Sequence, residues 1–388
     1  MRIATRIIQV LVALLFIVSG LVKANDPLGL AYKMEEFFDL WIPALHAGHF
    51  FAKIPLISLL EFLNHHMLFL SVVMITLEIV TGAALLVGWM KKSILYLLLV
   101  LIIFFSFLTG YAYLSGKFTN CGCFGDCLPI TPLTSFGKDI VLLLLIVFLL
   151  AGQKYIQPLF SSRVRSIIVT ISLLLTLFLQ WYVLKYLPLV DCLPMKKGNN
   201  IAEQMKPPKN AIPSVYETRL VYRNTKSEQL KDMSQDEFNS SKIWEDTTWK
   251  WKETKTKLIQ KGTDIPKLQN FVLKTLSDYD STEAILTYPG YSILYFVNRG
   301  NSDKLFDKNY WNNSAQKLPV YVVTSSPADF VSDTTENKYQ VFTTDGTVFR
   351  IAARVNPTIY LLKGGTIINK WPLAKIDEAK NFIDQLKK

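Results

Sequence analysis

The run Ser93–Ser115, SILYLLLVLIIFFSFLTGYAYLS, contains no charged residue over its whole length. A helix needs about 20 apolar residues to cross the hydrocarbon core of a bilayer, so this run is long enough to span a membrane. Four more runs in the first half of the chain are nearly as apolar: Ile7–Val22, Met67–Met90, Phe136–Gly152 and Ile167–Leu187. The sequence therefore predicts an α-helical membrane bundle of five spans.

The second half of the chain has a different composition. Half of the 388 residues are hydrophobic, but from Met195 to Lys388 charged, polar and apolar residues are mixed as in a soluble protein. We therefore predict a transmembrane domain at 1–190, a linker at 191–212 and a soluble domain at 213–388. The net charge of +11 is shared by both halves without a block of Lys or Arg, which argues against nucleic-acid binding.

Basic residues orient the spans, because cytoplasmic loops of membrane proteins are enriched in Lys and Arg. They precede the first span, and lie between spans two and three and between spans four and five: Arg2, Arg6, Lys91, Lys92, Lys154, Arg163 and Arg165. All share one side if the N-terminus is cytoplasmic. This predicts a multi-pass bacterial inner-membrane protein with a periplasmic C-terminal domain. A cleaved signal peptide is the rival interpretation of the first run, but Leu21-Val22-Lys23 fits a cleavage site poorly.

With this orientation all four cysteines face the oxidising periplasm. Three of them lie in the stretch Asn120–Cys127, NCGCFGDC, and the fourth, Cys192, follows the fifth span. Cys121 and Cys123 are too close in sequence for a structural zinc pair, and no second pair completes a site, so we expect no metal. A static disulfide staple and a redox centre both remain open.

The redox interpretation follows from the C-x-C spacing. A disulfide between two such cysteines closes a very small ring, and strained disulfides exchange more readily. Gly122 and Gly125 give the backbone the freedom that such a loop requires. Asp126 disfavours a thiolate at Cys127, so the C-x-C pair holds the better nucleophile, and Cys127 with Cys192 is the better relay or staple. The loop emerges at the end of a span, within reach of a lipid-soluble quinone and of a periplasmic protein.

These residues carry a resemblance to a known family. The stretch Ser19–Gly29, SGLVKANDPLG, resembles the first-span signature of DoxX-like membrane proteins, and Glu78 in an E-x-x-x-G setting resembles their second span. The stretch Cys121–Gly125, CGCFG, is similar to the cysteine loop of MauE, a methylamine-utilisation membrane protein linked to disulfide formation in its partner enzyme. The resemblance covers about the first 190 residues. It implies a DoxX/MauE-like four-helix core plus a fifth span, of the type that Bacteroidetes fuse to a periplasmic domain. It carries over the C-x-C pair but neither Cys127 nor Cys192.

Two other groups of polar residues lie in the apolar half. Glu78 lies inside the second span, where a carboxylate is costly, so we expect either a hydrogen-bonded packing group or a proton relay or quinone contact. The histidines lie in or beside the first outer loop among aromatic residues: His46, His49, His65 and His66. For them we expect packing at the membrane interface rather than a metal or haem site.

The soluble half shows strand and helix patterns. Alternating stretches predict early strands at Tyr216–Tyr222 and Trp244–Lys252. The later pattern predicts strands at Tyr291–Val297, Val320–Thr324, Thr358–Leu362 and Thr366–Trp371, a helix at Asp303–Lys317 and a closing helix that begins at Ile376.

This later order, β-α-β then β-β-α, resembles the thioredoxin fold from about residue 290 onward, and Asn356-Pro357-Thr358 resembles its cis-proline loop. The C-x-x-C of that fold belongs after the first strand, where this chain reads Asn298-Arg299-Gly300-Asn301. Since no cysteine follows Cys192, this domain is predicted to lack dithiol chemistry.

The sequence thus predicts an inner-membrane, redox-associated protein whose periplasmic loop takes part in thiol–disulfide exchange. The candidate residues are Cys121, Cys123, Cys127 and Cys192, with a quinone as the candidate electron acceptor and Glu78 as its candidate contact. The alternative is a non-catalytic scaffold or assembly factor that presents a redox-dead thioredoxin-like domain to an envelope protein. Both interpretations predict contact with membrane lipid and with a periplasmic or envelope partner.

Overall fold

The structure is a computed structural model that describes residues 2–47, 53–118, 122, 125, 127–128, 130–260, 262, 265–298, 305–328, 330 and 337–386. Five of its helices are long and apolar enough to cross a membrane. They are α1 (Arg2–Ala24), α4 (Met67–Val87), α5 (Lys91–Ser115), α6 (Pro132–Ala151) and α7 (Ser162–Tyr186). The five predicted spans are therefore confirmed as helices, with ends that differ by a few residues.

Glycines bring α1 and α4 together. A Cβ atom on Gly82 of α4 would lie 2.9 Å from the backbone oxygen of Ala13 in α1, and one on Gly20 of α1 would lie 2.5 Å from Cγ1 of Ile79 in α4. Small residues at such crossings allow helices to approach closely inside a membrane, where dispersion contacts drive association. This crossing places Glu78, the neighbour of Ile79, against the end of α1.

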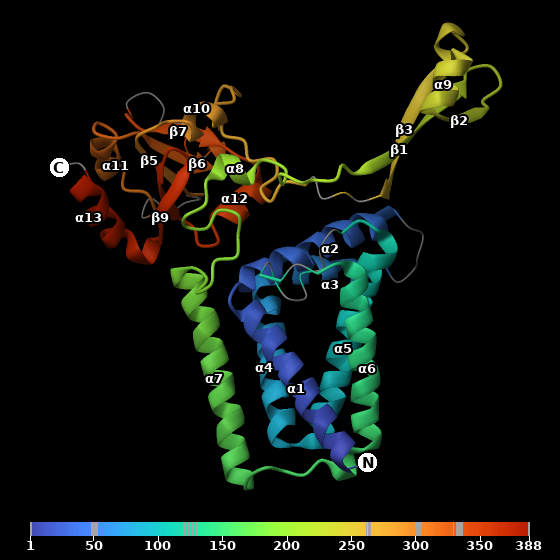
Figure 1. Ribbon diagram of the computed structural model, residues 1–388, viewed down its shortest axis with the longest axis vertical. Coiled ribbons are helices and arrows are strands. Elements are labelled where there is room, and N and C mark those ends of the chain that lie inside the picture. The colour runs from blue at the N-terminus through green and yellow to red at the C-terminus, as the bar shows by residue number, and fades with distance from the viewer. Residues whose placement is uncertain are drawn as a thin grey trace.

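Two further helices, α2 (Pro27–Ala47) and α3 (Lys53–His65), lie across one end of the bundle (Figure 1). We call this the capped end, and the opposite end, which carries the N-terminus, the N-terminal end. The start of α2 is fixed by Asp26, whose carboxylate accepts a hydrogen bond from the Gly29 N–H at 3.1 Å. Further along, the Phe37 ring stacks on Phe118 at 4.2 Å between centroids, which holds α2 against the chain after α5.

The C-terminal part is an α/β domain with a six-stranded sheet in the order β4-β7-β6-β5-β8-β9. The strands are β4 (Lys274–Thr275), β5 (Tyr291–Phe296), β6 (Val320–Thr324), β7 (Gln340–Thr343), β8 (Thr358–Lys363) and β9 (Thr366–Pro372). β5, β6 and β7 are parallel to one another, and the remaining pairs are antiparallel.

Helices cover both faces of this sheet. The helices are α8 (Ile201–Gln204), α10 (Thr282–Leu286), α11 (Lys308–Ser314), α12 (Gly346–Ala352) and α13 (Ile376–Leu386). Side chains alternate between the faces of a strand, so Tyr295 of β5 packs with Trp311 of α11 on one face, while Phe296 packs with Phe349 of α12 on the other. The predicted α/β class is therefore confirmed.

The details of this domain agree with the predicted pattern in part. The Asn356–Pro357 peptide bond is cis, as predicted for the loop before β8. The predicted helix at Asp303–Lys317 is wrong in extent, because α11 begins only at Lys308, after Asp307 accepts a hydrogen bond from the Tyr310 N–H. β7 and α12 were not predicted, since four and seven residues are too few to show a period.

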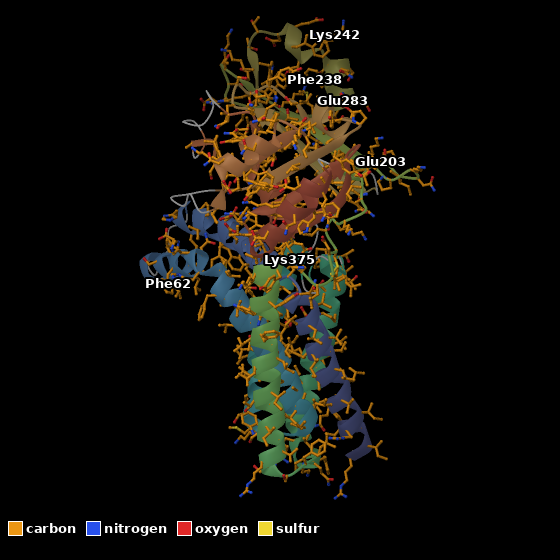
Figure 2. All side chains as sticks on the ribbon, turned by 90° about the vertical axis from the view of Figure 1, so that its left-hand side faces the viewer. Phe62, Glu203, Phe238, Lys242, Glu283 and Lys375 are labelled. Atoms are coloured by element: carbon orange, nitrogen blue, oxygen red, sulfur yellow. A yellow bond between two sulfur atoms is a disulfide. The ribbon has the colours of Figure 1, made fainter. Side chains whose placement is uncertain are left out.

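A separate three-stranded antiparallel sheet projects from the α/β domain, and we call it the arm (Figure 1). It consists of β1 (Val215–Asn224), β2 (Leu230–Ser234), α9 (Gln235–Ser241) and β3 (Trp249–Gln260). In Figure 2 its residues Phe238 and Lys242 lie beyond the α/β domain, far from the spans. The predicted strand Trp244–Lys252 is wrong over its first half, because Ile243–Glu245 forms a 3-10 turn and β3 begins only at Trp249.

The segment 191–212, predicted as a linker, contributes to the α/β core. Met195 and Ile201 are fully buried there, and the Ile201 N–H donates a hydrogen bond to the Gly365 oxygen at 2.9 Å. The arm leaves the domain just after this segment and returns at Leu268, whose N–H donates to the Gln204 oxygen at 3.0 Å. The arm is therefore an insertion whose two ends meet.

Candidate functional site

The cysteine loop joins α5 to α6 at the capped end of the bundle (Figure 1). Cys121, Cys123 and Asp126 lie outside the described residues. The described positions form a tight turn, in which the Gly125 N–H donates to the Gly122 oxygen at 2.9 Å. Their φ angles are +67° at Gly122 and +57° at Gly125, a region that residues with a side chain rarely adopt. The two glycines of the sequence motif therefore make this turn.

Cys127 and Cys192 form a disulfide with their Cα atoms 4.9 Å apart. It ties the cysteine loop to the chain that follows α7. The same chain is held by Asn25, whose amide donates to the Val190 oxygen at 2.8 Å and accepts from the Val190 N–H at 3.0 Å. The disulfide joins the two cysteines that lie outside the C-x-C motif.

The loop rests on the ends of α1 and α2. A Cβ atom on Gly122 would lie 2.9 Å from Cγ of Lys33 in α2, and one on Gly125 would lie 3.7 Å from the backbone oxygen of Val22 in α1. The close contact at Gly122 excludes a side chain there unless Lys33 moves. The two glycines of the loop therefore pack against the end of α1 and the first turns of α2.

Glu78 forms an ion pair with Lys23 inside the bundle. The Lys23 Nζ lies 2.7 and 2.8 Å from the two carboxylate oxygens, and the two side chains are only 3% and 4% exposed. The Ser19 hydroxyl donates to the same carboxylate at 3.4 Å, and the Phe105 ring centroid lies 4.5 Å from the ammonium. A charge inside a membrane needs such partners, since the lipid offers none. The sequence predicted that Glu78 would need a partner but did not identify it. The structure shows that this partner is Lys23.

A second buried carboxylate lies close by in α6. Asp139, which is 1% exposed, pairs with Lys138 at 2.9 Å and accepts a hydrogen bond from the Thr109 hydroxyl of α5 at 3.0 Å. Lys138 is less buried than Lys23, with 24% of its side chain exposed. Glu78 and Asp139 thus each face an ammonium of their own.

Two small cavities lie between these ion pairs and the cysteine loop, and Lys23 and Phe105 line both. The first is lined by Leu15, Phe16, Ser19, Lys23, Glu78, Ile102, Phe105, Lys138, Asp139 and Leu142. The second is lined by Lys23, Leu30, Lys33, Met34, Phe37, Phe105, Leu108, Thr109 and Gly122. Each measures about 20 Å³. Since a single water needs roughly 10–15 Å³, each cavity has room for about one water but not for a ring.

The histidines lie near α2 and α3. His46 lies 3.6 Å from the Glu61 carboxylate, with both side chains exposed, and the His66 Nδ1 lies 2.8 Å from the Phe62 oxygen. His49 lies outside the described residues. Across the part of the chain that the structure describes, no group of three His, Cys, Asp or Glu side chains could hold a metal ion.

The end of β5, where the thioredoxin fold carries its cysteines, holds a network of hydrogen bonds. The Asn298 N–H donates to Oδ1 of Asn356 at 3.0 Å, and the Asn356 amide donates back to the Asn298 oxygen at 2.8 Å. The Thr324 hydroxyl and the Ser325 N–H donate to Oδ1 of Asn298 at 2.9 and 3.0 Å. Residues 299–301 lie outside the described residues. The network ties the cis-proline loop to β5 and β6.

The α/β domain docks on the start of α2 through two arginines. Arg354 donates to the Asp26 carboxylate at 2.9 Å, and Arg350 donates to both Glu35 oxygens at 2.7 and 3.1 Å. Both guanidinium groups lie over the Tyr32 ring, at 5.3 and 4.9 Å from its centroid. Burial raises the pKa of the Tyr32 phenol, although the two arginines partly oppose that effect. No local sequence pattern pointed to this contact between distant parts of the chain.

Comparisons with known proteins find one family model and one similar protein. Residues 1–152 match the family model described as "Methylamine utilisation protein MauE". "Protein TlpB" of Flavobacterium psychrophilum is 27% identical over 148 residues, which cover 37% of this chain and 35% of that protein. The alignment thus spans about a third of the relative's length. No solved structure gives a significant match. The predicted resemblance to MauE is confirmed for a region that includes the cysteine loop.

Proposed function

We propose that this is a redox-associated membrane protein whose cysteine loop exchanges disulfides with a protein partner. The observation that carries the proposal is the Cys127–Cys192 disulfide. The chain has four cysteines, so this bond leaves Cys121 and Cys123 as the second pair. The match to MauE over residues 1–152 includes both of them, which supports the same assignment.

The proposed exchange is a two-step thiol–disulfide reaction. A thiolate of the partner attacks the Cys121–Cys123 disulfide and forms a mixed disulfide while one loop cysteine leaves as a thiolate. The second partner thiolate then resolves the mixed disulfide, so the partner is oxidised and the loop becomes a dithiol. A quinone is the acceptor in this proposal. It takes two electrons and two protons from the dithiol, becomes a quinol and restores the loop disulfide.

The geometry around Glu78 favours one of its two proposed roles. The ammonium of Lys23 occupies both carboxylate oxygens, and the cavity beside the pair holds about one water. A quinone ring does not fit this space. We therefore assign Glu78 to packing and propose that the quinone binds outside this cavity.

The proposed orientation has the capped end in the periplasm and the N-terminal end in the cytoplasm. Basic side chains gather at the N-terminal end, where Arg165 donates to the Gly88 oxygen at 2.9 Å and Lys91 donates to the Ile156 oxygen at 3.0 Å. This distribution agrees with the positive-inside rule. After reduction, a membrane-impermeant thiol reagent should label Cys192 once the outer membrane alone is opened; labelling only after lysis would contradict the orientation.

Replacing Cys123 by Ser tests the exchange. Cys121 would then attack the disulfide of an oxidised partner with no neighbour to resolve the product, so a mixed disulfide should accumulate on a non-reducing gel. Cys192→Ser is the matched control, because it opens the other bond and should not trap the same species. The proposal fails if Cys123→Ser traps nothing and all four thiols resist a mild reductant.

A scaffold is the second candidate, and the α/β domain provides the observation that favours it. Asn298 begins the segment where the thioredoxin fold carries its cysteines, and it is hydrogen-bonded to Asn356 of the cis-proline loop. Arg354 fastens the domain to the bundle. Such a domain suits a fixed binding surface for an envelope protein. The scaffold becomes the better account if the loop proves inert in the trapping experiment while deletion of the α/β domain abolishes partner binding.

A further inference from the structure

A cleft of about 270 Å³ separates the end of α7 from the α/β domain. Its α7 side is formed by Tyr182 and Tyr186, and its domain side by Lys370, Lys375 and Glu378. In Figure 2 Lys375 lies at the junction between the α/β domain and the top of α7. The cleft therefore opens where a span leaves the membrane.

The aromatic residues of α7 place this cleft at the level of the lipid headgroups. The rings of Tyr182 and Tyr186 lie 4.9 Å apart, and Lys185 lies 5.2 Å from the Trp181 ring and 5.3 Å from the Tyr186 ring. Tyr, Trp and Lys gather at the boundary between hydrocarbon and water. Below them, Phe178 and Trp181 are more than half exposed, so the surface that leads into the cleft faces lipid tails.

The charges of the cleft match a headgroup that carries both signs. Lys375 and Glu378 lie 3.3 Å apart at the rim, with about half of each side chain exposed. Lys370 lies deeper, where only 9% of it is exposed and its ammonium pairs with Asp191. The Lys375 ammonium complements a phosphate, and the neighbouring Glu378 carboxylate complements an amine. A headgroup that carries only negative charge has no amine to pair with Glu378, and the carboxylate would repel it.

We propose that the cleft binds one phospholipid with a phosphoethanolamine headgroup. The phosphate lies on Lys375 and the phenols of α7, the amine lies on Glu378, and the acyl chains lie along the exposed face of α7. The lipid then fills the space between α7 and β9 and fixes the height of the α/β domain above the membrane. This binding site is independent of the cysteine chemistry proposed above.

Native mass spectrometry of the full chain, released from nanodiscs of mixed phosphatidylethanolamine and phosphatidylcholine, tests the proposal. One phosphatidylethanolamine per chain should be retained in preference to phosphatidylcholine, whose quaternary amine cannot donate a hydrogen bond to Glu378. Lys375→Glu should reduce retention at least tenfold. Lys226→Glu in the arm is the matched control and should retain the lipid as the unaltered chain does. Both variants replace one exposed lysine by glutamate, so a difference in lipid retention between them must come from the position of Lys375 in the cleft.

A reversed pair separates charge recognition from a general loss of structure. Lys375→Glu with Glu378→Lys keeps the ion pair and should recover part of the retention. Excess inorganic phosphate should leave the lipid bound, because tails and amine contribute to binding. The proposal is overturned if both lipids are retained equally, if phosphate displaces the lipid, or if Lys226→Glu loses it as Lys375→Glu does.

Discussion

At the scale of single residues, the most unusual feature of the bundle is the buried ion pair between Lys23 and Glu78. Lys23 and Glu78 lie 55 positions apart in sequence, so no local pattern links them. The motif SGLVKANDPLG identified the region of Lys23 through a family resemblance but not its partner. Glu78 alone could be predicted as unusual, because a carboxylate within an apolar run is visible without any knowledge of the fold. Which helices cross, and where, decides the pairing.

The first prediction concerns this ion pair. Lys23→Met should destabilise the protein by about 3–5 kcal/mol, because it leaves an uncompensated carboxylate in the membrane interior. The double variant Lys23→Met with Glu78→Leu should recover most of that loss, since two apolar side chains suit the lipid-like surroundings. Thermal unfolding in detergent micelles measures both. A double variant as unstable as the single one would mean that the pair itself holds α1 to α4.

At the scale of elements, the spans were predicted well because a single property, an apolar length of about 20 residues, specifies them. The short elements of the α/β domain were predicted less well. α12 has seven residues and β7 four, and their packing against β5 and β6 stabilises them more than any periodicity in their own sequences. The extent of α11 was also predicted incorrectly, because its first residue is set by a hydrogen bond to the Asp307 side chain and not by a periodic pattern.

The second prediction concerns the α1–α4 crossing. Gly82→Ala should destabilise the bundle by about 1–3 kcal/mol, because the new Cβ would lie 2.9 Å from the Ala13 oxygen and from Ile17. Gly137→Ala in α6 is the control, since a Cβ there meets nothing within 4 Å. Alanine favours a helix by roughly 1 kcal/mol over glycine, so this variant should be neutral or stabilising. Equal effects in an unfolding assay would argue against a close-packed crossing.

At the scale of the whole molecule, two arginines join the soluble domain to the bundle. Arg354 and Asp26 lie 328 positions apart, and both side chains are mostly buried. Arg350 and Glu35 form a more exposed pair. Sequence analysis separated the chain into a membrane half and a soluble half by composition, and composition carries no information on how two halves contact each other. The docking of the α/β domain therefore had to come from the structure.

The third prediction ranks these two contacts. Arg354→Met should loosen the domain more than Arg350→Met, because Asp26 would lose its arginine while staying mostly buried, whereas Glu35 can reach water. Hydrogen exchange of the α12 amides measures the effect, with at least a tenfold faster exchange expected for Arg354→Met and less than threefold for Arg350→Met. Similar rates in both variants would show that Tyr32, rather than the buried ion pair, carries the contact.

The Cys127–Cys192 disulfide also sets an order on biosynthesis. Two whole spans, α6 and α7, separate its cysteines, which lie 65 positions apart in sequence. The bond can close only after both spans have threaded through the translocation machinery and Cys192 has emerged on the same side as Cys127. A closed bond therefore shows that both spans have been inserted. A nascent chain stalled before residue 192 would carry Cys127 as a free thiol, open to the wrong partner.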